Sequence, residues 1–130
     1  MSDATIIFHY RVRAFVYIEG KVLLARMKVA NYTYLPGGHI ELGENAASAL
    51  ARELQEELGE QSEIKNFLGA IENSWVQEGE RHHEINLIFN TYLPSLSPSS
   101  NPASKEDHLE FMWAGTGRLG GVATLSKEVL

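Results

Sequence analysis

The chain has 130 residues, of which 44% are hydrophobic and none is cysteine, and its formal net charge at pH 7 is −6. The lack of cysteine excludes a disulfide framework, thiolate metal sites and a cysteine nucleophile, and the acidic balance argues against a nucleic-acid partner. The length predicts one domain over residues 1–130. Because the first residues lack the pattern of a signal peptide, we expect a soluble, cytoplasmic protein with no membrane partner.

The first predicted element is a β-hairpin. Residues 11–18 and 21–27 are rich in Val, Ile, Phe and Tyr, and Glu19-Gly20 between them is a turn signal. The next extended piece ends at Leu35-Pro36-Gly37-Gly38. Proline disfavours helical angles in the residue before it, and paired glycines permit close backbone approaches. We therefore expect a tight turn at the two glycines.

A helix is predicted over residues 45–58. Asn45 is a suitable N-cap, and Gly59 is well placed as the C-terminal stop. Apolar residues recur at helical spacing on one side of the segment, namely Ala47, Leu50, Ala51, Leu54 and Leu58. This side is expected to face the core.

The remaining elements alternate strands with one long loop. Strands are predicted over residues 64–76 and 84–93, joined by a turn. Residues 94–108 hold three of the four prolines and five serines, so we predict a loop close to the functional site. A last strand is expected over residues 109–114 and a short closing helix over residues 119–130. His82 and His83 precede the second of these strands and, being adjacent, are expected to point to opposite faces rather than form a zinc site.

Glutamates dominate one face of the predicted helix. At about 100° per residue, Glu53, Glu56 and Glu57 fall in one narrow sector, and Glu60 continues their line. Like charges three and four residues apart destabilise a helix by a few tenths of a kcal/mol per pair. Arg52 is the only basic residue of the segment. The pattern indicates that cations from outside the chain offset this charge.

Basic residues gather on the other side of the two glycines. They are Arg11, Arg13, Arg26 and Lys28, while the acidic residues gather between positions 41 and 63. A small phosphate-bearing ligand bound together with divalent cations would suit both segments.

The spacing that starts at Gly38 resembles the signature of the Nudix hydrolase family in its MutT-like form. Five residues separate Gly38 from Glu44, and seven more precede Arg52-Glu53-Leu54. One residue then precedes Glu56-Glu57, and one more precedes Gly59. Glu60 departs from the pattern, because the family has an aliphatic residue there. The resemblance implies an α/β/α sandwich with a mixed sheet.

The resemblance also implies an activity, namely hydrolysis of a pyrophosphate bond in a nucleoside diphosphate linked to another group. Water is the implied nucleophile, and Mg²⁺, or alternatively Mn²⁺, is the implied cofactor. Carboxylates on a rigid helix suit Mg²⁺, which prefers oxygen ligands. The predicted metal-binding residues are Gly37, Gly38, Glu44, Glu53, Glu56 and Glu57. Arg52 joins the last three as a catalytic residue that orients the carboxylates.

Several assignments stay open at this point. The base that activates water is either Glu53 or one of the loop carboxylates Glu106, Asp107 and Glu110. The predicted substrate-binding residues are Arg26, Lys28, His39 and Tyr34. Nucleoside triphosphates, ADP-ribose, NDP-sugars and dinucleoside polyphosphates all remain candidate substrates. A non-catalytic nucleotide or ADP-ribose sensor is the alternative function, and a homodimer is compatible with the family.

Overall fold

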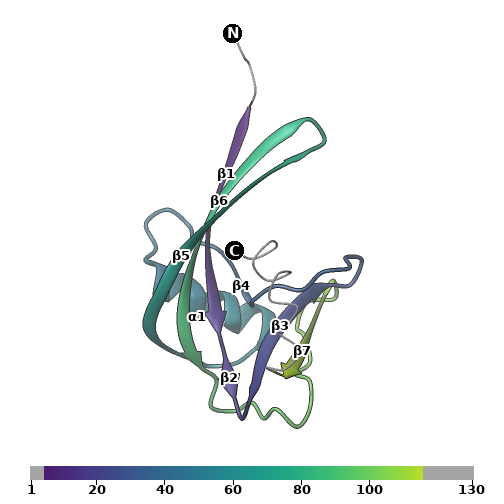
Figure 1. Cartoon of the computed structure of the whole chain (residues 1–130). Coiled ribbons are helices and arrows are strands. Elements are labelled where there is room, and N and C mark those ends of the chain that lie inside the picture. Colours follow the sequence, from purple (N-terminus) through teal and green to yellow (C-terminus); the bar gives the residue numbers. More distant parts are fainter. Residues whose placement is uncertain (1–4, 116–130) are drawn as a thin grey trace.

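The computed structural model describes residues 5–115, which form two β-sheets and one helix (Figure 1). One sheet has four strands in the order β4-β1-β6-β5, and the other has three in the order β2-β3-β7. In chain order the elements are β1 (Ile6–Phe15), β2 (Tyr17–Ile18), β3 (Lys21–Met27), β4 (Gly37–His39), α1 (Ala46–Leu58), β5 (Glu63–Gln77), β6 (Glu80–Tyr92) and β7 (Leu109–Gly115).

The four-stranded sheet is mixed. Strand β1 runs parallel to β6 and antiparallel to β4, whereas β5 and β6 form an antiparallel hairpin. The outer parts of β1, β5 and β6 project beyond the rest of the molecule (Figure 1). We call this projection the arm, and define it as residues 6–10, 72–77 and 80–85. The α/β class with a mixed sheet is confirmed, while the closing helix predicted over residues 119–130 lies outside the described residues.

The first predicted hairpin is only partly correct. Glu19 and Gly20 form the turn with positive φ values of 49° and 79°, as expected for a tight hairpin. However, only Tyr17–Ile18 pairs with β3. The preceding strand begins at Ile6, earlier than predicted, and pairs with β6 and β4 in the other sheet. The chain changes sheets at Val16, which is completely buried between them.

The predicted helix is confirmed together with both of its caps. The Asn45 side chain accepts a hydrogen bond of 2.8 Å from the Ser48 backbone N–H. Gly59 adopts a left-handed conformation with φ 70°, which ends the helix and turns the chain away. Glu60 therefore does not continue the helical line of glutamates, contrary to the sequence prediction. Leu50 and Leu54 are completely buried and pack with β1 and β3 in the core.

The two glycines belong to a strand rather than to a free turn. Gly37 and Gly38 pair with Arg13 and Val12 of β1, so β4 forms the edge of the mixed sheet beside α1. The predicted turn is wrong in this respect, because the glycines let the backbone lie against β1 instead of reversing direction. The close backbone approach itself is confirmed at both positions, as the site geometry shows.

The later elements agree with the predictions, although β6 starts at Glu80 rather than at residue 84. Residues 94–108 form an irregular loop, and the Lys105 backbone N–H donates to the Glu57 carbonyl at 2.7 Å. The loop thus reaches the C-terminal end of α1. In the part of the chain that the structure describes, no helix has both the length and the apolar character needed to cross a bilayer.

Candidate functional site

The site is centred where α1 meets β4. A Cβ atom on Gly38 would lie only 2.2 Å from Glu53 Oε2, and one on Gly37 would lie 2.0 Å from the Val12 carbonyl oxygen. Both contacts are far shorter than real Cβ contacts, so neither position tolerates a side chain as the structure stands. The double glycine therefore brings a stretch of main chain directly against the Glu53 carboxylate.

Arg52 connects the glutamates of the motif. Its Nε donates to Glu44 at 2.8 Å, and its Nη1 donates to Glu53 at 2.9 Å and to Glu56 at 3.3 Å. Its Nη2 donates to the His39 carbonyl at 3.1 Å, which ties the helix to the end of β4. The guanidinium fork thus contacts three carboxylates at once. Its predicted role in orienting them stays a prediction.

Glu57 is the most buried of the motif carboxylates, with a relative exposure of 7%. Burial raises its pKa to about 9, and the hydrogen bond and charge of neighbouring Glu53 act in the same direction. At neutral pH, Glu57 is therefore protonated and hydrogen-bonded to Glu53.

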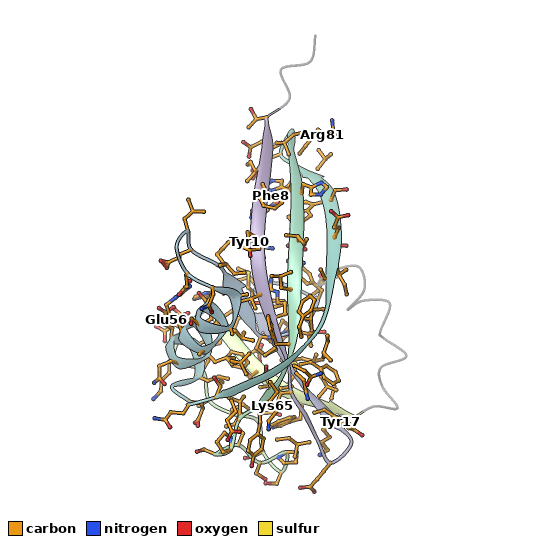
Figure 2. The ribbon with its side chains drawn as sticks, turned by 90° about the vertical axis from the view of Figure 1, so that its left-hand side faces the viewer. Phe8, Tyr10, Tyr17, Glu56, Lys65 and Arg81 are labelled. Carbon is orange, nitrogen blue, oxygen red and sulfur yellow. The ribbon has the colours of Figure 1, made fainter. Side chains whose placement is uncertain are left out.

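Glu44 and Glu56 are in more polar surroundings. Hydrogen bonds from Arg52 and from the Glu41 backbone N–H lower the Glu44 pKa to about 2, so this carboxylate is ionised at neutral pH. The Glu56 side chain is 54% exposed, and Figure 2 shows it on the outer side of α1. The predicted metal-binding glutamates thus differ sharply in exposure, although they share one helical stripe.

A pocket of about 280 Å³ opens in front of Glu53 and Glu57. Arg11 and Arg13 of β1 line it together with Tyr34, Gly38 and His39. Arg13 is buried, donates to Asn86 at 3.1 Å and lies 5.2 Å from the centre of the Tyr34 ring. The pocket therefore has carboxylates on one wall and guanidinium groups on another, a combination that suits metal ions bridging to phosphate oxygens.

Only two of the four residues predicted to bind substrate line this pocket. Tyr34 and His39 line the pocket. Arg26 instead donates to Glu110 on β7 and, like Lys28, is not among the residues that line it. Their assignment to the substrate stays a prediction that the geometry does not support.

Arg11 and Arg13 belong to the basic segment expected to suit a phosphate-bearing ligand, but only Arg26 and Lys28 of that segment were predicted to bind substrate. Arg11 and Arg13 are two residues apart in a strand, so both point to the same face, and their pairing with β4 places that face beside the double glycine. The sequence shows that Arg11 and Arg13 share one face of a strand, but it does not show that this strand pairs with β4. Of the carboxylates predicted as bases, Glu110 lies on β7 rather than in the loop and is paired with Arg26, whereas Glu106 lies in the loop and is close enough to Glu57 to help raise its pKa.

Within residues 5–115, no three acidic or histidine side chains are grouped as a ready-made metal site. Arg52 contacts Glu44, Glu53 and Glu56, and Glu53 also faces Glu57.

Comparison with known proteins gives the family. The NUDIX domain model matches residues 7–124, so the chain belongs to the NUDIX hydrolase family. The protein named 'Putative mutator protein MutT4' of Mycobacterium tuberculosis (strain CDC 1551 / Oshkosh) is 44% identical over 50 residues, which cover 38% of this chain and 20% of that protein. An ADP-ribose pyrophosphatase of Methanocaldococcus jannaschii is 32% identical over 74 residues, which cover 55% of this chain and 43% of that protein. The matched segments thus span less than half of either curated relative.

Solved structures show the same fold. A NUDIX hydrolase from Nitrosomonas europaea superposes with a TM-score of 0.68 at 18% identity, covering 93% of this chain and 82% of the other. A MutT protein from Methanosarcina mazei Go1 gives a TM-score of 0.67 at 21% identity, covering 96% and 88%. At these identities the likeness establishes the fold alone.

Proposed function

We propose that the protein hydrolyses a pyrophosphate bond in a nucleoside diphosphate linked to another group, with Mg²⁺ as cofactor and water as nucleophile. The observation that carries this proposal is the Glu53–Glu57 pair, which is held against the Gly38 backbone and faces two arginines across one small pocket. The activity named for the M. jannaschii relative, which acts on ADP-ribose, supports the same reaction class.

The residues present fit a divalent metal. Glu53 and Glu57 are two neighbouring acidic groups, and the raised pKa of Glu57 reflects the cost of ionising both in a partly dry site. A cation removes that cost, because it favours the ionised form of both carboxylates. Gly38 leaves room for a main-chain oxygen to approach the same point.

Glu53, Glu56 and Glu57 would hold the metal, with the Gly37–Gly38 main chain and Glu44 at its edge. When bound, Mg²⁺ would polarise a phosphoryl oxygen and lower the pKa of bound water. Arg52 keeps the carboxylates in place, while Arg11 and Arg13 orient the diphosphate from the opposite wall. Glu53 or a loop carboxylate accepts the proton of the attacking water, and the position of Glu106 near Glu57 keeps both choices open.

We further propose that residues 1–130 form one NUDIX hydrolase domain, that the protein works in the cytoplasm on small molecules, and that a homodimer is its solution state. The apolar side chains that support self-association are on the face of the arm remote from the pocket. They are Ile6, Phe8 and Tyr10, with exposures of 59%, 60% and 39%, and Figure 2 shows Phe8 and Tyr10 along β1. Light scattering after size exclusion measures this state directly.

The reaction is tested with a panel of ADP-ribose, NDP-sugars and nucleoside triphosphates, each incubated with Mg²⁺ or with EDTA. We expect nucleoside monophosphate or pyrophosphate to appear only with Mg²⁺. Saturable binding of these compounds without turnover of any of them would reject the hydrolase and favour the sensor.

A further inference from the structure

A second, larger pocket adjoins the first. Its volume is about 670 Å³, and Arg11, Met27 and Tyr32 line both pockets, so the two are continuous. The inner face of the arm forms its other wall. A space of this size is within the range of roughly 300–1,000 Å³ that is usual for small-molecule sites, whereas the pyrophosphate pocket alone is too small for a whole nucleotide derivative.

Three aromatic rings from three adjacent strands line this pocket. They belong to His9 on β1, His82 on β6 and Trp75 on β5. Their ring centres are 5.1 to 5.6 Å apart, and the planes lie within 12° of parallel. His9 Nε2 and His82 Nδ1 are 2.9 Å apart, which fixes the two imidazoles relative to each other. The three rings therefore form one aromatic platform on this face of the sheet.

The polar groups of the pocket are mostly neutral or already paired. The Glu84 carboxylate, only 2% exposed, accepts hydrogen bonds from Arg11 and Asn73. Asn73 and Gln77 offer both donors and acceptors. Burial and the charge of Arg11 lower the pKa of His9, which keeps this ring neutral at neutral pH. Arg13, the second guanidinium of the small pocket, is not among the lining residues of the large one.

The two pockets differ in the charge of their lining residues, so each matches a different kind of ligand group. Phosphates match the small pocket, where two guanidinium groups face the carboxylate pair. An uncharged, planar group with hydrogen-bonding edges matches the large pocket, because it gains stacking energy on the platform and finds amide partners around it. A bare sugar would gain less from a flat aromatic surface.

We infer that the large pocket binds the nucleobase of the substrate on the Trp75–His82–His9 platform, with Arg11 at the junction to the diphosphate. This inference rests on the proposed function for its substrate class and adds which half of the molecule the arm recognises. Trp75 is then a specificity-determining residue that touches the base, remote from the reacting bond.

The chain offers a direct optical test, because Trp75 and Trp113 are its only tryptophans. Trp113 lies on β7, donates to the Ser100 carbonyl and lines neither pocket. In the Trp113→Phe protein, emission therefore comes from Trp75 alone. The probes are AMP, GMP, CMP and UMP, each titrated in EDTA, with ribose 5-phosphate as the control that has the phosphate and sugar but no base.

We expect saturable quenching by at least one nucleotide and none by ribose 5-phosphate. Measured by calorimetry, Trp75→Ala in the wild-type background should weaken binding of that nucleotide by at least about 5-fold. Trp75→Phe should weaken its binding less, because an aromatic ring remains for stacking. The comparison of nucleotides with ribose 5-phosphate is made within one protein and does not depend on how the Trp75 variants fold.

Two outcomes would overturn the inference: quenching by ribose 5-phosphate as strong as by every nucleotide, or equal nucleotide affinity in the wild type and Trp75→Ala. The titrations contain no metal and measure no hydrolysis. Base binding without turnover would thus reject the proposed reaction and keep this inference. Normal turnover with the same kinetic constants in wild type and Trp75→Ala would keep the proposed reaction and reject this inference.

Discussion

The Cα of Gly38 lies directly against the carboxylate of Glu53, so closely that a Cβ at this position would be 2.2 Å from Oε2. This contact joins the edge strand β4 to the helix α1, and it sets the distance between the main chain and the acidic cluster. Its consequences are open to direct test.

Gly38→Ala is expected to reduce kcat by at least ~10²-fold, because the new methyl group must push Glu53 out of its position and a misplaced reacting group costs this much. The measurement is Mg²⁺-dependent turnover of whichever panel compound is cleaved. Gly115→Ala is the matched control, since a Cβ there meets nothing within 4 Å, and it should behave as wild type. Full activity of Gly38→Ala would show that the contact is dispensable.

Arg52→Lys should lower kcat by about 10-fold or more while the fold is retained, as is typical when a group that orients metal ligands is lost. A lysine keeps the charge but cannot donate to Glu44, Glu53 and the His39 carbonyl together. Steady-state kinetics and Mg²⁺ titration measure the effect. Arg81→Lys, an exposed position at the tip of the arm (Figure 2), is the control. Equal kinetics of the two variants would remove Arg52 from the mechanism.

The raised pKa of Glu57 predicts how Mg²⁺ stabilisation depends on pH. Its folded-state pKa of about 9 lies above the unfolded value of 4.5, so its protonated form contributes stability at low pH that is lost as pH rises towards 9. We expect Mg²⁺ to displace this proton when it binds, because a cation favours the ionised carboxylate. The rise in Tm on adding Mg²⁺ should therefore be larger at pH 8.5 than at pH 6, and Glu57→Gln should abolish the difference. A pH-independent rise in wild type would contradict this linkage.

Arg11→Lys and Arg26→Lys distinguish the site seen in the structure from the one expected from sequence. Arg11 lines the pocket, so loss of its planar fork should raise KM by about 10-fold, the scale of one charge-assisted hydrogen bond. Arg26 is paired with Glu110, and its replacement should leave KM within about 2-fold. Lysine is used at position 11 so that buried Glu84 keeps a cationic partner. The opposite order of effects would restore Arg26 as the substrate-binding residue.

Local signals explain what could be predicted from the sequence. The helix and its glutamate stripe could be predicted because their signals act over one or two turns. These signals are the N-cap Asn45, the C-terminal stop at Gly59 and the apolar spacing of Leu50 and Leu54. The motif spacing that starts at Gly38 likewise fixed which carboxylates share a face.

Long-range pairing explains what could not be predicted. Arg11 and Arg13 enter the site only because β1 leaves the expected hairpin and pairs with β4 and β6. The platform needs His9, Trp75 and His82, which come from three strands whose register no local pattern specifies. The solvent exposure of each glutamate could not be predicted from helical periodicity either. Glu57 is buried and Glu56 is exposed, although both fall on the same predicted stripe.

The central claim is that Glu57 binds the metal that drives pyrophosphate hydrolysis, and turnover by Glu57→Gln compared with Glu60→Gln tests it most directly. Both substitutions remove one carboxylate, but position 57 faces the pocket whereas position 60 lies beyond the end of α1. With Mg²⁺ and a cleaved substrate, we predict at least ~10²-fold lower kcat for Glu57→Gln and an unchanged value for Glu60→Gln. Equal turnover by the two variants would contradict the account.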